Sequence, residues 1–474
     1  MKNKLLKVFI IVLLIMFNAM FSVACNNQID TSAYGDLPVI KITTENKKQP
    51  KDKENYINCS FELTDPKNDK NNLSVSMKES YDYDKDDGGV GIRLRGNTTM
   101  SYAKKPYRIK FEKSKSLFGL QKAKSWVLLA DYLDQSSIRN YTAMTLGNDA
   151  FTNLDFTAHP THVVLELNGE YKGVYLLCEQ MDEKKGRTNV EVEEDDLYAN
   201  YQKAEFPFLI EMDEYAKSDT SIDEKDRLIL DGYFPIEIKY PEAKDRGTLD
   251  GQDIFYDYIT EYLTAVKQTL KTKTKVSVSF RPEPVGFEDL VDISSLIDYN
   301  LLNEFMYNPD SIWKSSYMHK QANKVDENGN IIEYGKLKIG PVWDFDFSMG
   351  GHFTGQPYDK SYIEWARHTS VFCASIFFAD FLKNEDNYLL VQNRWNEVSQ
   401  NVKNVTNKLR DYKAYISSAC KQDAIKWYGK NGDFQFDMQY DYVRLFTLDR
   451  LDYFNELFSL IKKSLWFKEN NSLK

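Results

Sequence analysis

The sequence predicts an α+β fold with a β-rich N-terminal lobe and a mainly helical C-terminal lobe. Short segments that alternate apolar and polar residues dominate residues 38–182, whereas apolar residues recur at helical spacing from Gly251 onward. The 474 residues are 42% hydrophobic and 14% aromatic, which excludes a disordered, collagen-like or multi-span membrane chain. A net charge of −10 argues against affinity for a phosphate backbone, so no nucleic-acid partner is expected.

Residues 1–24 have the pattern of a secretory signal peptide. Three lysines precede the apolar run VFIIVLLIMF, and small residues follow in FSVAC. The Ser-Val-Ala-Cys ending resembles a bacterial lipobox, although Ser22 stands where leucine is usual. Residues 25–37 are therefore expected to be a lipidated Cys25 and a polar tether, which would hold an exported lipoprotein on the outer face of the bacterial cytoplasmic membrane. An uncleaved single-span anchor is the alternative.

The N-terminal lobe, residues 38–182, is expected to contain strands in PVIKITT, INCSFELT and GVGIRLRG. A strand and a serine-capped helix follow in SWVLLADYLD and SSIRNYTAMTLGNDAF. Two apolar runs then flank Asn168-Gly169, the dipeptide that most favours a tight β-hairpin turn.

The C-terminal lobe, residues 183–474, begins with a charge-dense, loop-rich stretch that is interrupted by FPFLIEM and followed by the strand FPIEIKYPE. Helices are expected in DIFYDYITEYLTAVKQTL and LVDISSLIDYNLLNEFMY, then a long hairpin from SSYMHK to GPVWDFDF. Two amphipathic helices around 383–415 and 434–463 complete the lobe. The cysteines after Cys25 have no metal-type spacing and are expected to be mostly buried thiols: Cys59, Cys178, Cys373 and Cys420.

Two aspartates in GPVWDFDFSMGG are candidate metal ligands. If this segment is a strand, Asp344 and Asp346 project from the same face, and two carboxylates that close together favour a cation between them. Mg²⁺ is typically held by one or two carboxylates together with phosphate oxygens. The alternative is an acidic strand face exposed to solvent.

Two neighbouring segments have the residues of a phosphate site. Arg95 leads into the turn Gly-Asn97-Thr98-Thr, whose N–H groups and hydroxyls suit an anion. In KKPYRIKF, Arg108 and Lys110 share one face of a strand and form a cationic stripe. The alternative for this stripe is solvent-facing charge on an edge strand.

A third acidic residue is expected near the candidate metal ligands. A helix should end before Pro309, which leaves Asp310 on a turn that leads to the hairpin with Asp344 and Asp346. A carboxylate that receives a hydroxyl proton beside carboxylates that hold a metal is the arrangement that phosphoryl transfer requires. The sequence has no HExxH zinc motif, GxSxG nucleophile or P-loop.

These segments occur in the order IRLRGNTTMSYAKKPYRIKF, SWVLLADYLDQSSIRN, VVLELNGEYKGVYLLCEQ with GRTNVEV, and GPVWDFDFSMG. In this order the chain resembles the CotH kinase family, named after spore-coat protein H. The resemblance runs from about Leu37 to the helix near Trp395. It implies a diverged, two-lobed protein-kinase-like fold that uses ATP and Mg²⁺ or Mn²⁺ to phosphorylate serines of spore-coat or cell-surface proteins.

The resemblance also implies roles for individual residues. Asp344 resembles the metal-binding aspartate of kinases, Asp346 is a second candidate ligand, and Asp310 resembles the aspartate that receives the substrate proton. Arg108 or Lys110 resembles the lysine that holds the α- and β-phosphates.

Further positions follow from the same resemblance. Arg95, Asn97 and Thr98 fall in the phosphate-covering turn, and Glu179 stands where a hinge segment would meet the adenine.

Two departures from the kinase pattern leave an alternative open. The helix after Ser136 has no glutamate to pair with the phosphate-binding cation, and Ser315 and Ser316 stand where an asparagine usually binds a second metal. An exported protein also meets little ATP. The alternative is therefore a catalytically inactive surface lipoprotein that serves as a binding or structural module. A carbohydrate-active enzyme is disfavoured by the close spacing of Asp344 and Asp346.

Overall fold

The computed structural model describes residues 31–351 and 377–459, apart from residues 83–85, 193–205, 221, 231, 233, 247–251, 313 and 383. The predicted signal segment, Cys25 and Cys373 lie outside the described residues. Cys59, Cys178 and Cys420 are buried free thiols, as expected. Within the described residues, no helix combines the length and the apolar character needed to cross a membrane.

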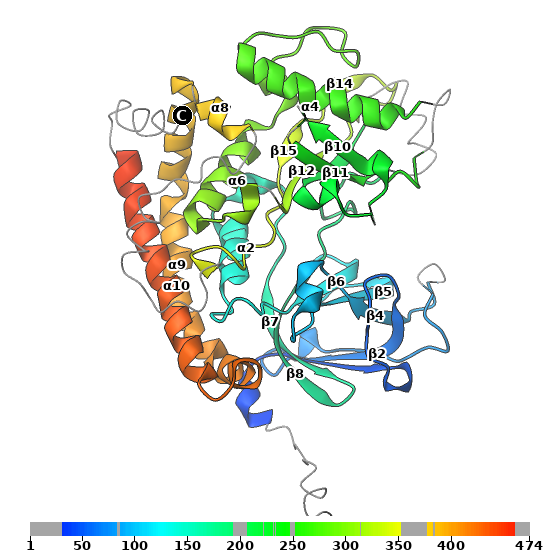
Figure 1. Cartoon of the computed structure of the whole chain (residues 1–474), viewed down its shortest axis with the longest axis vertical. Coiled ribbons are helices and arrows are strands. Elements are labelled where there is room, and N and C mark those ends of the chain that lie inside the picture. The colour runs from blue at the N-terminus through cyan, green and yellow to red at the C-terminus, as the bar shows by residue number, and fades with distance from the viewer. Residues whose placement is uncertain are drawn as a thin grey trace, which may run out of the picture.

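The N-terminal region is an eight-stranded sheet that closes on itself (Figure 1). Its strands are β1 (Val39–Thr44), β2 (Ile57–Thr64), β3 (Leu73–Val75), β4 (Val90–Leu94), β5 (Tyr107–Lys115), β6 (Ala123–Leu129), β7 (Thr161–Leu167) and β8 (Glu170–Glu179). The order is β1-β7-β8-β6-β5-β4-β2-β3, and β1 also pairs with β2. This second pairing converts the sheet into a barrel with β3 attached to β2. The expected β-rich N-terminal region is thus present.

Successive side chains on a barrel strand point alternately into the core and outward, so apolar residues fill the barrel and charged residues lie on its outer face. On β5, Tyr107, Ile109 and Phe111 are buried in the barrel core, whereas Arg108 and Lys110 lie on the outer face. This arrangement confirms the predicted cationic stripe. Because β5 lies between β4 and β6, the stripe is not on an edge strand. The predicted hairpin also forms, with Asn168-Gly169 at positive φ between β7 and β8.

The C-terminal region contains a second sheet. The strand in FPIEIKYPE and the long hairpin that begins at SSYMHK were predicted, but their joining into one sheet was not. Its strands are β9 (Phe208–Met212), β10 (Arg227–Leu230), β11 (Phe234–Tyr240), β12 (Ser316–Lys320) and β15 (Leu337–Ile339), in the order β10-β11-β9-β12-β15. Two further strands, β13 (Lys324–Val325) and β14 (Ile331–Glu333), form a small hairpin of their own. One face of the five-stranded sheet packs against α4 (Ile254–Thr272) and α6 (Ile293–Met306) in the largest core cluster.

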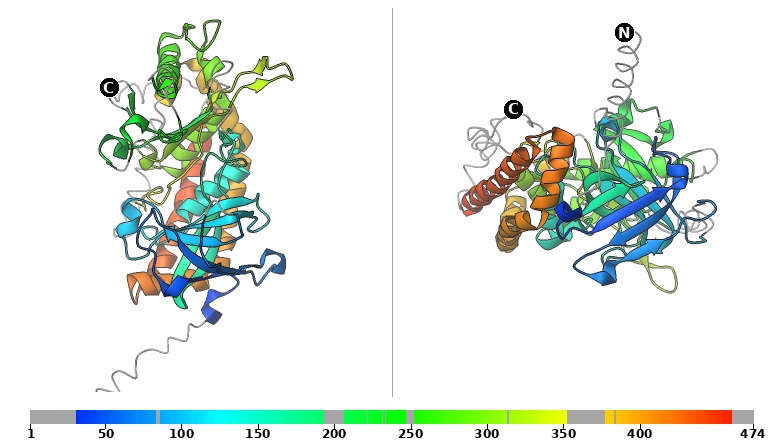
Figure 2. Two further views of the ribbon diagram at one scale, coloured as in Figure 1. Left: turned by 90° about the vertical axis from the view of Figure 1, so that its right-hand side faces the viewer. Right: turned by 90° about the horizontal axis from the view of Figure 1, so that it is seen from below.

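Two long helices form one side of the molecule (Figures 1 and 2). They are α9 (Glu385–Tyr428) and α10 (Gly432–Ser459), and the shorter α5 (Phe287–Leu290) and α8 (Phe378–Leu382) lie near α4. Near its start, α9 is tied to α6, where Arg394 Nε donates to Asp298 at 2.7 Å. Near its end, Asp423 reaches the barrel. α9 therefore joins the barrel to the helical region.

Candidate functional site

A small cavity lies where the barrel meets the helical region. Its volume is about 40 Å³, room for an ion and a water molecule. A nucleotide would require the walls to move apart. The polar side chains that line it come from distant parts of the chain: Arg95, Thr99, Lys104, Asp131, Asn140, Asp344 and Asp346.

Asp344 and Asp346 both line the cavity, but the predicted strand geometry is wrong. The strand β15 ends at Ile339, and Asp344 has φ 65°, in the left-handed region. The residues from 346 to 350 form turns. The two carboxylates therefore face the same space because the backbone reverses at Asp344, and not because side chains alternate on a strand.

The two carboxylates differ in their partners. Asp344 Oδ2 accepts a hydrogen bond from Ser315 Oγ at 3.2 Å. Asp346 is only 8% exposed, and no described residue donates a hydrogen bond to its side chain. Burial, followed by the charges of Asp344 and Asp131, raises the pKa of Asp346 well above its usual range. A buried carboxylate without a donor favours a cation or a proton beside it.

Asp310 lies close enough to Asp344 and Asp346 for their charges to interact, but it does not line the cavity. α6 ends at Met306, and Asp310 opens the short 3₁₀ helix η9 (Asp310–Ile312). Burial and then the charge of Asp344 raise the pKa of Asp310 to about 6, while Lys314 opposes this effect. Of the two serines that follow, Ser315 bonds to Asp344. Ser316 instead donates to the carbonyl of Ser311, away from the carboxylates.

No three carboxylates near the cavity converge as closely as three ligands of one metal ion do. In no trio drawn from Asp131, Asp310, Asp344 and Asp346 does each residue offer an oxygen within 4.8 Å of the other two. Among the described residues, Glu211, Asp213 and Glu237 on the five-stranded sheet do converge that closely. However, Lys239 Nζ already lies 2.8 Å from Glu237 and 3.5 Å from Glu211, so a side-chain cation partly neutralises that trio.

Arg95 is the predicted phosphate residue that reaches the cavity. Its guanidinium lies 5.4 Å from the ring centre of Trp343. Burial lowers the pKa of Arg95, and the nearby charge of Asp344 opposes the shift. Asn97 and Thr98 are exposed and do not line the cavity, because Asn97 Oδ1 accepts from Lys53 and Thr98 Oγ1 lies 3.0 Å from the Tyr215 hydroxyl.

The predicted stripe on β5 lies outside the cavity. Arg108 donates to Ser125 Oγ at 3.0 Å, and its charge is near Arg95. Burial, followed by the charges of Arg108, Arg93 and Lys184, lowers the pKa of Lys110 to about 8.

Glu179, the predicted adenine-contacting position, has its carboxylate bound by His159. Its carboxylate accepts a hydrogen bond from the backbone N–H of His159 at 2.7 Å and lies 3.0 Å from the His159 ring. Burial raises the pKa of Glu179, but the hydrogen bonds from His159 outweigh burial, so the pKa is lowered. The side chain is therefore occupied by His159.

The sequence predictions missed Asp131 and Asn140, which line the cavity, and the neighbouring ion pair of Asp134 and Arg139. Asp131, Asp134, Arg139 and Asn140 all belong to the segment DYLDQSSIRN, which connects β6 to α2 (Arg139–Asp149). α2 begins without the predicted serine cap: its N-cap is Ile138, and Asp134 Oδ2 accepts from the Arg139 N–H at 2.9 Å. The charged residues that this segment places between a strand and a helix were the feature of the sequence that could have indicated a functional site.

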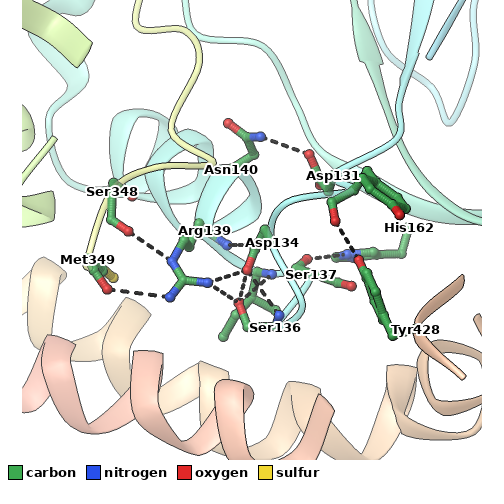
Figure 3. A network of polar contacts seen from close by, with 12 residues as sticks. Asp131, Asp134, Ser136, Ser137, Arg139, Asn140, His162, Ser348, Met349 and Tyr428 are labelled. Carbon is green, nitrogen blue, oxygen red and sulfur yellow. Dashed lines mark hydrogen bonds and ion pairs between the residues drawn. The ribbon is translucent and has the colours of Figure 1, made fainter. Parts of the chain in front are cut away.

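Arg139 fixes the backbone that follows Asp346 (Figure 3). Its guanidinium donates to the carbonyls of Ser348 at 2.8 Å and Met349 at 3.4 Å, and pairs with Asp134. A Cβ at Gly351 would lie 2.4 Å from the carbonyl oxygen of Asp346, so the loop closes only with glycine there. Gly351 thus lets the loop pack on itself.

The chain was compared with protein families and with curated proteins. The model of the family described as CotH kinase protein matches residues 92–454, which include every residue that lines the cavity. No curated protein matches the chain.

Proposed function

Because the chain belongs to the CotH kinase family, we propose that it transfers the terminal phosphoryl group of ATP to serine side chains of other proteins. The observation that carries this proposal is that Asp344 and Asp346 line one cavity with Arg95, while Asp310 lies close enough for the charge of Asp344 to raise its pKa. In this proposal the barrel and the helical region are the two lobes of a diverged kinase-like fold, divided near residue 182.

The residues at the cavity fit a divalent cation such as Mg²⁺ or Mn²⁺. Asp346 is buried without a hydrogen-bond donor among the described residues, and Asp344 lies beside it. Hard oxygen ligands and a space for water are what Mg²⁺ requires. When bound, such an ion neutralises charge on the phosphate oxygens. Ser315 holds the Asp344 carboxylate in place.

Asp310 and Arg95 take the remaining roles. With a pKa raised to about 6, the Asp310 carboxylate is still mostly ionised near neutral pH and is basic enough to accept the proton of a serine hydroxyl. Arg95 offers a fixed cation for the transferred phosphate, with Arg108 behind it on the barrel.

The second candidate is a binding or structural module without catalysis. Two observations favour it. The cavity is smaller than a nucleotide. In addition, the lysine that lines the cavity, Lys104, pairs with Asp423 on α9, whereas a kinase lysine pairs with a glutamate of the helix that corresponds to α2. A kinase-like scaffold with these features can persist for binding alone.

One experiment separates the two candidates. The purified protein is incubated with ATP and Mn²⁺ and analysed by mass spectrometry for phosphate on serine, with Asp344→Asn as the control. Phosphoserine in the wild type alone supports transfer. A thermal shift with nucleotide but no phosphoserine supports the binding module, since a ligand at 100 times its Kd stabilises a protein by about 2.7 kcal/mol.

We further propose that the protein is an exported lipoprotein anchored through Cys25. The signal-like segment and the Ser-Val-Ala-Cys ending support this location. Metabolic labelling with an alkyne fatty acid tests it: the wild type should be labelled and Cys25→Ala should not.

A further inference from the structure

We propose that Asp131 is a third carboxylate of this cation site, one that holds the ion's water molecules and not the ion itself, and that Asn140 is the residue that positions it. This inference rests on the proposed function, because it assumes a divalent cation at Asp344 and Asp346.

Asp131 is placed at the cavity by its backbone. It follows the end of β6 with φ 45°, a left-handed conformation that aspartate tolerates better than most residues. Its side chain lines the cavity together with Asp344 and Asp346. Among the described residues its only hydrogen-bond partner is Asn140, and it has no ion-pair partner. One oxygen of Asp131 is therefore held, and the other is available to the cavity.

Asn140 joins two segments at the cavity with one amide group. Figure 3 shows its bond to Asp131. Its Nδ2 donates to Asp131 Oδ1 at 2.8 Å, and its Oδ1 accepts from the Phe345 N–H at 2.8 Å. The backbone N–H can only donate, so the amide oxygen must face Phe345 and the NH₂ group must face Asp131. In the sequence, Phe345 stands between Asp344 and Asp346, the two predicted metal ligands. Asn140 thus fixes Asp131 relative to both of them.

The protein cations near the cavity are already engaged. Lys104 is bound by Asp423, and the guanidinium of Arg139 is used by Asp134 and two backbone carbonyls. Asp346 is more than nine-tenths buried and receives no hydrogen bond from the described residues. Among the described residues that line the cavity, Arg95 is the cation that remains for these carboxylates. Buried charge of one sign requires neutralisation, and the small cavity admits an ion with water.

The spacing of the oxygens excludes direct binding of one ion by all three carboxylates, and because Asp344 and Asp346 are the ligands in the proposed function, Asp131 is left as the outer carboxylate. Mg²⁺ lies about 2.1 Å from its ligands, so two direct ligands are at most about 4.2 Å apart. Asp131, Asp344 and Asp346 do not all converge within 4.8 Å. Mg²⁺ keeps several of its waters, and a carboxylate just beyond the ligands binds those waters. Loss of such a partner typically weakens metal binding roughly 10- to 100-fold.

Binding of Mn²⁺ alone, followed by electron paramagnetic resonance, tests the inference without nucleotide or activity. Asp131→Asn and Asn140→Leu should each weaken Mn²⁺ binding roughly 10- to 100-fold. Glu237→Gln, in the other acidic trio, should bind as the wild type does. If Asp131→Asn fails to fold, Asp131→Gly removes the carboxylate while suiting the left-handed backbone.

The outcomes separate this inference from the proposed function. If Asp346→Asn abolishes binding while Asp131→Asn and Asn140→Leu bind like the wild type, only the inference is overturned. If the wild type binds no Mn²⁺, or if Glu237→Gln alone loses it, both the inference and the proposed metal site are overturned.

Discussion

The Lys104 ammonium lies 2.9 Å from the Asp423 carboxylate, and both side chains are at least 95% buried. Lys104 also donates to the carbonyl of Val174, and Asp423 Oδ1 accepts from the Val174 N–H at 2.9 Å. A Cβ at Gly173 would lie 1.9 Å from Asp423 Oδ1, and Gly173 has φ 115°. The pair therefore fastens the end of α9 to the middle of β8.

Replacing Lys104 by methionine should destabilise the protein by about 3–5 kcal/mol, because it leaves Asp423 buried without its cation. Urea unfolding measures the change. The matched control is Lys172→Met, which breaks an ion pair to the exposed Glu170 and should cost no more than about 1 kcal/mol. Equal effects of the two variants would contradict a special role for the buried pair.

Asp344→Asn should abolish serine phosphorylation while the Tm stays within a few degrees of the wild type. The substitution keeps the shape of the side chain but removes the charge that a metal requires. Asp411→Asn, at an exposed position on α9, is the control and should retain full labelling. Labelling of the Asp344 variant at the wild-type rate would rule out Asp344 as a metal ligand.

Asp310→Asn should keep nucleotide and metal binding but lose transfer, since an amide cannot accept the serine proton. A thermal shift with ATP and Mn²⁺ reports binding, and mass spectrometry reports transfer. Loss of the thermal shift with transfer intact would reverse the roles assigned to Asp310 and Asp344.

Stability should fall between about pH 6.5 and 4 because of His162. Burial lowers its pKa to about 4, and the neutral ring is held between the Tyr412 hydroxyl at 2.7 Å and the Ser137 carbonyl at 2.8 Å. Above pH 6.5 the His162 ring is neutral in both the folded and the unfolded protein. Below it the unfolded chain binds a proton that the folded protein excludes, which favours unfolding by up to about 3 kcal/mol.

His162→Gln removes this titration, so its stability should depend less on pH over the same interval than that of the wild type. Urea unfolding at pH 7 and pH 4.5 measures the difference. Parallel loss of stability in both proteins would show that other groups, and not His162, cause the acid sensitivity.

Local sequence patterns were sufficient to predict those features of the structure that depend on residues close together in the sequence. The turn at Asn168-Gly169, the end of α6 before Pro309 and the alternation on β5 all follow from backbone preferences or from burial on one face. Each depends on a few consecutive residues, and each was predicted.

Features that depend on distant partners were not predicted. β10 is only four residues long and lies in a charge-dense stretch, so the five-stranded sheet was missed. Asp344 adopts positive φ in a segment that alternates like a strand, and its surroundings override that pattern. At the site, the approach of Asp310 to Asp344 was expected, whereas the contact between Asn140 and Phe345 spans 205 residues and leaves no local signal.

The shared helix α9 also affects the order in which the protein can fold. Forty-four residues in helical form extend about 66 Å, and the part that completes the barrel lies at the far end. During synthesis, Lys104 and the amide of Val174 remain without Asp423 until most of the chain has left the ribosome. The contacts of the N-terminal region are therefore completed only when the end of α9 is available. A chain truncated before α9 would lack Asp423, the partner of Lys104 and of the Val174 amide.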